Sequence, residues 1–238
     1  MKKAVIILSG GLDSTTCMGI ADEQGYSLYP LTFDYGQRHR IELINARKVA
    51  DYYGVGERMK LITLPFLRDF GGSALTDDQI DVPRMEAHKV ETSNESMNNH
   101  NENEDIPVTY VPGRNLLFLS IATSYAEAIG AEAIYIGVNA LDYSGYPDCR
   151  PNFIAKVNEV IALATKVGVQ GGTMRIHTPL IDMTKADIVR EGLRLDVPYV
   201  LTTSCYNGGV EACGECDSCV LRLRGFAEAG SVDPITYM

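Results

Sequence analysis

Residues 4–15 are Ala4-Val5-Ile6-Ile7-Leu8-Ser9-Gly10-Gly11-Leu12-Asp13-Ser14-Thr15. The five apolar residues predict a buried strand, and the two adjacent glycines predict a turn that opens a helix. Glycines let a backbone approach a ligand closely and turn its N–H groups inward, while the N-terminus of a helix adds a positive dipole. The stretch therefore predicts an α/β fold with a phosphate-binding loop after its first strand.

The alternative interpretation of this stretch is a well-capped strand-to-helix turn without a ligand. The loop carries no lysine, whereas a Walker-type loop uses Gly-Lys-Ser/Thr to place a lysine on the β- and γ-phosphates. Asp13 is either a cap of the helix or a ligand for the magnesium that accompanies a nucleotide. Ser14 and Thr15 add hydroxyls to the loop, and its context between an apolar strand and a helix start favours the binding loop.

Apolar runs and helical patterns alternate along the rest of the chain. Strands are predicted at 4–8, 27–33, 59–64 and 133–138, and helices at 13–24, 38–53 and 115–129. This alternation predicts a parallel, Rossmann-like sheet with helices on both faces. Because ligands bind at the carboxyl ends of such strands, residues 9–15, 34–36 and 137–139 are expected on one edge. Ordinary turns are the alternative for the two later segments.

The 238 residues suit one α/β domain over 1–200 followed by a C-terminal segment over 201–238, and 45% hydrophobic residues suffice for a sizeable core. An acidic, asparagine-rich insertion interrupts the domain at about 70–106. Between 77 and 105, nine acidic residues face two basic ones. We expect a solvated surface insertion that buries little, and a lid over the site is the functional alternative.

The net charge of −10 argues against a protein whose main partner is nucleic acid, because phosphate contacts need clustered Lys and Arg. No apolar stretch reaches the roughly 20 residues that span a bilayer, and Met1-Lys2-Lys3 leads directly into the first strand rather than into a signal peptide. We therefore expect a cytoplasmic protein with no membrane partner. A homodimer is the general expectation for a soluble enzyme.

Four cysteines near the C-terminus have the spacing of a metal site. Cys205 is followed by Cys213, Cys216 and Cys219, which form two overlapping C-x-x-C units, and residues 220–226 predict a helix beside the last ligand. Four thiolates around a tetrahedral ion are the usual closed structural zinc site. An iron–sulfur cluster and redox-active thiols are the alternatives. Because protein fills all four positions, we expect a structural rather than a catalytic metal.

The other cysteines and the histidines indicate no further site. Cys17 and Cys149 are expected to be structural residues. The four histidines show no ligand spacing among themselves, and no dyad can be inferred from their order.

Two cationic side chains stand at the start of predicted helices. Arg114 follows Tyr110-Val111-Pro112-Gly113 and, with Asn115, can hold a carboxylate or phosphate. A surface charge and a helix cap are the alternative for this pair. Lys185 is a candidate for a second cation on the phosphates, and a solvated lysine at a helix start is its alternative.

Residues 139–151 have the composition of a recognition loop, because polar and aromatic side chains follow a predicted strand. Tyr143 and Tyr146 can sandwich a flat heterocycle, while Asp142 or Asp148 can accept from a guanine-like N–H edge. A turn rich in glycine and proline, with incidental tyrosines, is the alternative.

The string Ser9-Gly10-Gly11-Leu12-Asp13-Ser14 resembles the pyrophosphate loop of the N-type ATP pyrophosphatases, which split ATP between the α- and β-phosphates to adenylate a substrate oxygen. Over nearly its whole length, the chain further resembles the family of 7-cyano-7-deazaguanine synthases, the nitrile-forming ligases of queuosine precursor biosynthesis. The strings that carry this resemblance are Phe33-Asp34-Tyr35-Gly36-Gln37-Arg38-His39, Val111-Pro112-Gly113-Arg114-Asn115, Asp142-Tyr143-Ser144-Gly145-Tyr146-Pro147-Asp148-Cys149-Arg150 and the four cysteines. The acidic stretch before Ile106 is longer than the family pattern.

The resemblance implies that 7-carboxy-7-deazaguanine, ammonium and ATP give the nitrile through adenylated carboxylate and amide intermediates. It implies ATP and Mg²⁺ at the loop, one structural Zn²⁺ at the cysteines, and catalytic roles for Asp13, Ser14 and Lys185. The residues expected to bind the nucleotide are Leu8, Ser9, Gly10, Gly11, Leu12, Asp13, Ser14, Thr15, Thr16, Cys17 and Met18. The residues expected to bind the substrate are Arg114, Asn115, Asp142, Tyr143, Tyr146, Asp148 and Arg150. An RNA-modifying adenylating enzyme and a non-catalytic nucleotide-binding scaffold are the rival interpretations.

Overall fold

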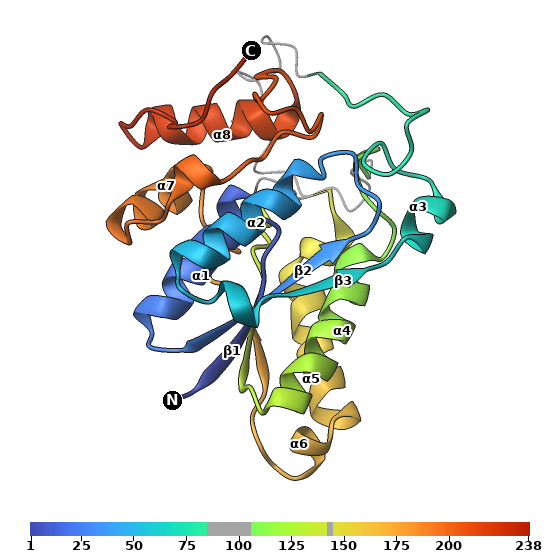
Figure 1. The fold of residues 1–238 in the computed structure, drawn as a ribbon. Helices are drawn as coiled ribbons and strands as arrows, with labels where there is room; N and C mark the ends of the chain where they lie inside the picture. The colour runs from blue at the N-terminus through green and yellow to red at the C-terminus, as the bar shows by residue number, and fades with distance from the viewer. Residues whose placement is uncertain (85–105, 142–144) are drawn as a thin grey trace.

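A five-stranded sheet forms the centre of the computed structural model, which describes residues 1–84, 106–141 and 145–238 (Figure 1). The strands are β1 (Lys3–Ile7), β2 (Ser27–Asp34), β3 (Lys60–Thr63), β4 (Ala133–Tyr135) and β5 (Arg175–His177). All neighbouring strands are parallel, in the order β3-β2-β1-β4-β5. The predicted parallel α/β fold is therefore confirmed. The acidic insertion falls largely outside the described residues, and Asp142 and Tyr143 fall entirely outside them.

Helices connect the strands and extend beyond them. They are α1 (Leu12–Glu23), α2 (Ile41–Tyr52), α3 (Phe66–Phe70), α4 (Arg114–Ile129), α5 (Pro151–Ala164), α6 (Lys166–Val169), α7 (Lys185–Arg194) and α8 (Asp217–Glu228), with short 3-10 helices η1 (Gly56–Arg58), η4 (Pro147–Cys149) and η5 (Tyr199–Leu201). The helices predicted at 13–24, 38–53 and 115–129 correspond to α1, α2 and α4. No helix in the described part of the chain is both long and apolar enough to cross a membrane.

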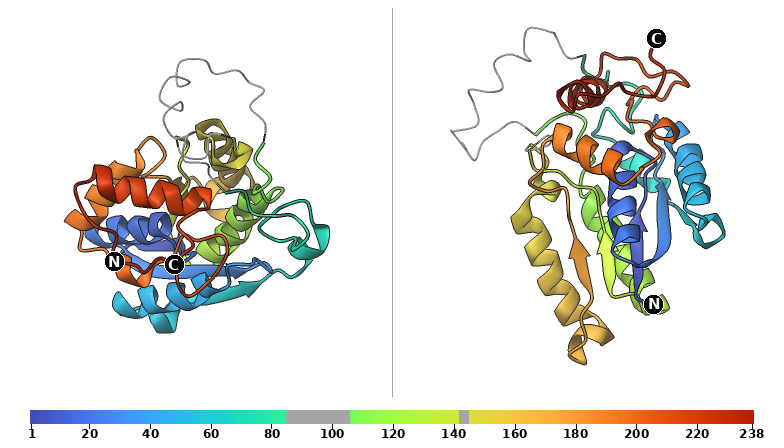
Figure 2. Two further views of the ribbon diagram at one scale, coloured as in Figure 1. Left: turned by 90° about the horizontal axis from the view of Figure 1, so that it is seen from above. Right: turned by 90° about the vertical axis from the view of Figure 1, so that its left-hand side faces the viewer.

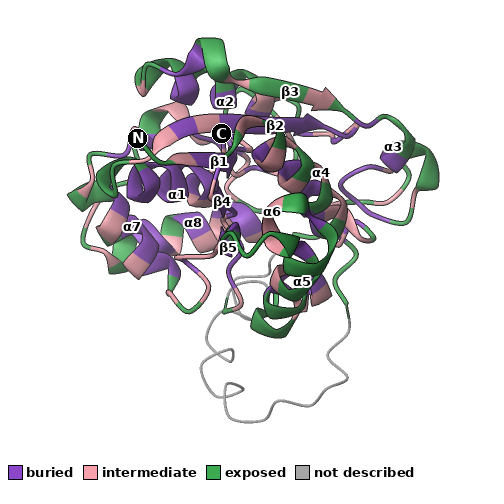
Figure 3. Cartoon of the chain, turned by 90° about the horizontal axis from the view of Figure 1, so that it is seen from below, coloured by how far each residue is buried: buried purple, intermediate pink, exposed green. Residues whose placement is uncertain are grey.

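The side chains of β1 alternate between two hydrophobic cores, one on each face of the sheet. Val5 and Ile7 belong to a core that includes residues of α4 and α5, whereas Ala4, Ile6 and Leu8 belong to a core that includes residues of α1, α2 and α7. Because β1 is covered on both faces, its sequence is continuously apolar rather than alternating. Figure 2 shows the helices on both faces, and Figure 3 shows buried residues gathered between sheet and helices.

The carboxyl edge of the sheet contains a reversal of strand order. The chain runs from β1 outward to β2 and β3, then returns to β4 on the other side of β1. Such a reversal leaves a crevice at the carboxyl ends of the two central strands, where ligands bind in α/β proteins. Ser9 follows β1 and Gly137 follows β4, so the segments expected at this edge do lie there.

β4 ends earlier than predicted because the chain leaves the sheet to form the site. The amide Nδ2 of Asn139 donates to the carbonyl oxygens of Leu180 and Met183 at 3.0 and 2.6 Å. These bonds hold the end of β4 against the loop that precedes α7. A Cβ at Gly137 would lie 2.9 Å from the backbone nitrogen of Ser14, so this close approach to the glycine loop needs glycine.

The C-terminal segment packs on the rest of the chain through α8, which lies along α7 (Figure 1). Arg222 on α8 forms an ion pair with Asp233, with 2.7 Å between Nε and Oδ2, and both side chains are 1% exposed. Nη1 of Arg222 also donates to Oγ1 of Thr202 at 2.8 Å. These bonds connect the tail, α8 and the segment after η5. The division into 1–200 and 201–238 stays a prediction.

We expect Arg222→Ala to lower the free energy of unfolding by about 3–5 kcal/mol, because it leaves the Asp233 carboxylate buried without its cation. Arg224→Ala is the matched control on the same helix. Arg224 pairs with Glu228 at the surface of α8, and such a pair contributes about 0.3–0.5 kcal/mol. Urea denaturation of the wild type and both variants measures the two losses. Similar losses in the two variants would contradict the stabilising role of the buried pair.

Candidate functional site

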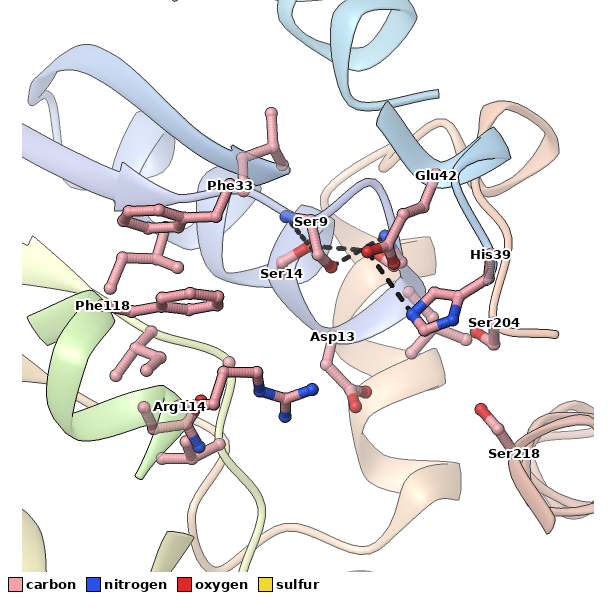
Figure 4. Close-up of a pocket in the computed structure, with 18 of the residues that line it drawn as sticks. Ser9, Asp13, Ser14, Phe33, His39, Glu42, Arg114, Phe118, Ser204 and Ser218 are labelled. Carbon is pink, nitrogen blue, oxygen red and sulfur yellow. Dashed lines mark hydrogen bonds and ion pairs between the residues drawn. The ribbon is translucent and has the colours of Figure 1, made fainter. Parts of the chain in front are cut away.

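A cleft lies at the carboxyl ends of β1 and β4, where the strand order reverses. It holds about 1070 Å³ of empty space, part of which is open to solvent. The loop after β1, the first turns of α2 and α4 and the segment before α8 form its walls (Figure 4). The polar and charged residues that line it are Ser9, Asp13, Ser14, His39, Glu42, Arg114, Asn115, Asn139, Thr203, Ser204 and Ser218, and the aromatic ones are Phe33, Tyr35, Phe118, Tyr146 and Tyr206.

The glycine loop after β1 packs closely against the backbone of α2. Gly10 has a φ of +90°, and a Cβ there would lie 2.3 Å from the carbonyl oxygen of Glu42, so a larger residue does not fit. The Ser9 hydroxyl accepts from the N–H of Gly11 at 3.2 Å and lies 3.0 Å from the Ser14 hydroxyl. α1 begins directly after the loop, and its positive end faces the cleft. This arrangement suits a phosphate group.

The structure places the predicted nucleotide-binding residues in two groups. Leu8, Ser9, Gly11, Leu12, Asp13 and Ser14 line the cleft, whereas Gly10, Thr15, Thr16, Cys17 and Met18 lie behind it. The carbonyl oxygen of Gly10 accepts from the N–H of Thr203 at 3.1 Å. The hydroxyl of Thr16 lies 2.8 Å from that of Tyr199. Cys17 and Met18 are fully buried in the core, as expected for a structural Cys17.

Asp13 and Lys185 meet at the mouth of the glycine loop. Nζ of Lys185 lies 2.8 and 2.9 Å from the two carboxylate oxygens of Asp13. Thr184 caps α7 by accepting from the N–H of Asp187, which fixes the helix start and hence the position of Lys185. Asp13 is therefore not the cap of α1, whose N-cap is Gly11. Lys185 is 9% exposed and is not a solvated lysine.

The first turn of α4 places Arg114 in the cleft. Nη1 of Arg114 donates to the hydroxyl of Tyr35 at 3.1 Å, and the guanidinium carbon lies 5.6 Å from the centre of the Tyr35 ring. The backbone N–H of Asn115 donates to Oδ2 of Asp148 at 3.0 Å. Burial raises the pKa of Asp148, while Arg114 and the Asn115 N–H oppose the rise. The Asp148 carboxylate thus accepts a hydrogen bond from the first turn of α4.

Of the other residues predicted to bind the substrate, some line the cleft and others do not. Tyr146 lines the cleft, with its hydroxyl 2.5 Å from that of Thr109 and its ring 5.9 Å from that of Tyr110. Asn115 also lines the cleft, whereas Asp148 and Arg150 are not among the lining residues. The structure therefore brings Arg114, Asn115 and Tyr146 to the glycine loop.

Two titratable residues of the cleft were not predicted from the sequence, Glu42 on α2 and His39 in the loop before it. Nε2 of His39 lies 3.5 Å from Oε1 of Glu42, and Nε2 of Gln37 donates to the same oxygen at 3.0 Å. Burial raises the pKa of Glu42 to about 8, although Gln37 and Arg114 oppose this. Burial and then Arg114 lower the pKa of His39 to about 4, so its imidazole is neutral at pH 7. A glutamate in the first turn of a helix ordinarily interacts with the helix dipole in solvent, so its position carried no signal of burial.

The four predicted metal ligands lie together. Their Sγ atoms, from Cys205, Cys213, Cys216 and Cys219, are all within 4.8 Å of one another. The N–H of Cys213 donates to Sγ of Cys205, and that of Cys216 to Sγ of Cys213, each at 3.4 Å. Hydrogen bonds from Cys216 and Cys219 lower the pKa of Cys205, and donation to Cys205 raises the pKa of Cys216. Four neighbouring thiolates need a cation, so this donor set fits a metal ion.

The cysteine cluster adjoins the cleft through its sequence neighbours. Ser204 and Tyr206 flank Cys205, and Ser218 precedes Cys219, and all three line the cleft. The ring centroid of Tyr206 lies 6.0 Å from that of His39. A metal held by these thiolates therefore also fixes one wall of the cleft.

The parallel sheet, the glycine loop at its reversal point and the four-cysteine cluster define an α/β protein with a candidate phosphate-binding loop and a candidate metal site. The chain belongs to the family described as queuosine biosynthesis protein QueC, whose model matches residues 3–230. It is 58% identical to a 7-cyano-7-deazaguanine synthase of Oceanobacillus iheyensis, covering 100% of this chain and 99% of that protein. Synthases of the same name from Acetivibrio thermocellus (100% of this chain, 99% of that one) and Thermoplasma acidophilum (99% and 92%) are 52% and 51% identical.

We expect the stability difference between the wild type and Glu42→Gln to depend on pH. The folded pKa of Glu42 is about 8, above its usual 4.5, so the protonated carboxyl favours the folded state. This contribution is complete below pH 4.5 and is lost as pH rises towards 8, by up to about 1.4 kcal/mol per pH unit. Glutamine does not titrate, so the wild type should lose stability relative to the variant over this window.

Urea denaturation at several pH values between 5 and 8 measures this difference. Glu57→Gln is the control, because the Glu57 side chain is 98% exposed. A difference between the wild type and Glu42→Gln that does not change with pH would contradict the raised pKa.

Proposed function

We propose that the chain converts 7-carboxy-7-deazaguanine, ammonia and ATP into 7-cyano-7-deazaguanine, as a ligase of queuosine precursor biosynthesis. The observation that carries the proposal is the gathering of the glycine loop, the Asp13–Lys185 pair and Arg114 around one cleft. A nucleotide phosphate at the glycine loop and a carboxylate at Arg114 would therefore lie in the same cleft. Relatives named 7-cyano-7-deazaguanine synthase, similar over the full chain, support the choice of substrate.

The reaction needs activation because oxide is a poor leaving group and a carboxylate does not react with ammonia. In the proposed sequence, a carboxylate oxygen attacks the α-phosphate of ATP and pyrophosphate leaves. Ammonia then displaces AMP from the acyl adenylate and gives the amide. The amide oxygen is adenylated in the same way, and loss of AMP and of both nitrogen-bound protons gives the nitrile.

The glycine loop is the proposed site of the departing pyrophosphate. Backbone N–H groups around Gly11, the Ser14 hydroxyl and the positive end of α1 stabilise its charge. Lys185 adds a cation beside the loop, and its contact with Asp13 orients it. Asp13 also offers carboxylate oxygens that suit Mg²⁺, which when bound neutralises charge on the phosphates.

Arg114 is the proposed group for the carboxylate of the substrate. A guanidinium binds a carboxylate through two parallel hydrogen bonds, and Tyr35 holds this one from the side. The aromatic rings of Tyr146 and Tyr206 line the same cleft and offer surfaces for a flat base.

We assign one Zn²⁺ with a structural role to the four cysteines. Protein thiolates fill all four positions of a tetrahedral ion and leave none for a substrate. The ion, when bound, holds Ser204, Tyr206 and Ser218 where they face the cleft.

The test of this function is incubation of the purified protein with ATP, Mg²⁺, ammonium and 7-carboxy-7-deazaguanine, with base and nucleotide products followed together by mass spectrometry. We expect 7-cyano-7-deazaguanine and AMP, and neither without the carboxylate. Folded protein that binds ATP but forms no nitrile would overturn the proposed function.

We expect Asp13→Ala to lower adenylation by about 10²-fold or more, because Lys185 loses its orienting partner and the metal loses a carboxylate. ATP–pyrophosphate exchange in the presence of 7-carboxy-7-deazaguanine measures this step. Circular dichroism and metal content should match the wild type. Asp22→Ala, at the exposed end of the same helix, is the control. Wild-type exchange in Asp13→Ala would remove Asp13 from the mechanism.

A further inference from the structure

Glu42 is an acidic residue of the cleft without a cationic partner. Asp13 pairs with Lys185, but no lysine or arginine in residues 1–84, 106–141 or 145–238 forms an ion pair with Glu42. Oε1 of Glu42 accepts from Gln37 and lies near His39, whereas Oε2 has no hydrogen-bond partner within the described ranges. One carboxylate oxygen at the cleft is therefore available to a ligand.

His39 contributes a second unsatisfied atom to the same wall. His39 lines the cleft with its side chain 9% exposed, and its buried Nδ1 has no hydrogen-bond partner among the described residues. Buried polar atoms in proteins are normally hydrogen-bonded. The Glu42 carboxyl, with Oε1 held by Gln37 and its other oxygen available, therefore suits a small ligand that carries N–H donors.

Glu42 lies on a different element from the groups that suit anions. Close packing of Gly10 on the backbone of Glu42 holds α2 beside the glycine loop, while Arg114 approaches the cleft from α4 (Figure 4). The charged or titratable groups that act on the Glu42 carboxyl are His39 from the loop before α2, Tyr35 from the end of β2 and Arg114. Lys185 and Arg114 suit the phosphates and the carboxylate, which leaves Glu42 for a cationic reactant.

We propose that Glu42 binds the ammonium ion that supplies the nitrogen and accepts a proton from it, with His39 as a positioning residue for the carboxyl. The inference rests on the proposed function, in which ammonium is the cationic reactant. The pKa of about 8 that burial gives Glu42 supports this role, because proton transfer is most effective when the pKa lies near the working pH.

Two protons leave the ammonium nitrogen in this step. Ammonium gives one proton to the ionised Glu42 carboxylate and becomes ammonia with a free electron pair. That pair forms the C–N bond at the activated carbonyl carbon, and the bond from this carbon to the bridging oxygen breaks. AMP leaves with the bonding electrons, and the surplus proton on nitrogen passes to the departing phosphate. Glu42 returns its proton to solvent before the next ammonium binds.

The test compares the wild type with Glu42→Gln in three assays. The first is ATP–pyrophosphate exchange with 7-carboxy-7-deazaguanine and no ammonium, which should stay within about threefold of the wild type. The second is nitrile formation against ammonium concentration, in which kcat/KM for ammonium should fall by about 10²-fold or more. The third replaces ammonium with hydroxylamine, which is largely unprotonated at neutral pH, and hydroxamate formation should be nearly retained.

Glu57→Gln is the matched control and should behave as the wild type in all three assays. Glu42→Asp keeps a carboxylate, so it should retain more activity with ammonium than Glu42→Gln. Glu42→Ala serves as the test variant if the glutamine variant does not fold. Wild-type dependence on ammonium in Glu42→Gln would overturn the inference, and so would equal losses with ammonium and hydroxylamine. Absence of exchange in the wild type would instead overturn the proposed function.

Discussion

Close backbone packing around Gly10 is the constraint on which the site depends. The glycine loop has room for no side chain at this position, because the carbonyl oxygen of Glu42 occupies the space. On the other side, the Gly10 carbonyl oxygen accepts from the N–H of Thr203, at the start of the segment that leads to the cysteine cluster. One loop residue thus sets the positions of α2 and of the C-terminal segment. A side chain here would move the phosphate loop, Glu42 and the cysteine-bearing wall together.

The cationic side chains of the site and the acidic Glu42 come from different elements. Lys185 and Arg114 provide positive charge from α7 and α4, where phosphate and carboxylate groups are proposed to bind. Glu42 and the neutral His39 form a different wall beside the loop. In the proposed reaction, the cationic nitrogen source and the two anionic reactants would therefore be bound by side chains of different elements. The cysteine cluster stays outside this division and contributes to the cleft through Ser204, Tyr206 and Ser218.

The sequence predicted the parts of this molecule that depend on local pattern. The loop from Ser9 to Ser14, the position of Lys185 at a helix start and the four cysteines carry their signals in residue type and spacing, and each lies where it was expected. β5 has three residues and α5 begins with a proline that reads as a turn, so neither was predicted. The pairing of Asp13 with Lys185 and the burial of Glu42 arise from contacts between distant segments, which periodicity does not reveal. The role of the Asp148 carboxylate was not predictable for the same reason, because its contact with the first turn of α4 depends on how two distant segments fold together.

Two oxygens of the base are proposed to attack the α-phosphate of ATP in this cleft in turn, first a carboxylate oxygen and then the oxygen of the amide. The most direct measurement uses 7-carboxy-7-deazaguanine with both carboxylate oxygens labelled with ¹⁸O and follows the label by mass spectrometry. We expect two molecules of AMP for each nitrile, each carrying one labelled oxygen, and no label in inorganic phosphate or pyrophosphate. Label in inorganic phosphate would show attack at the γ-phosphate, and label in water would show that no phosphorus was attacked; either result would contradict the account.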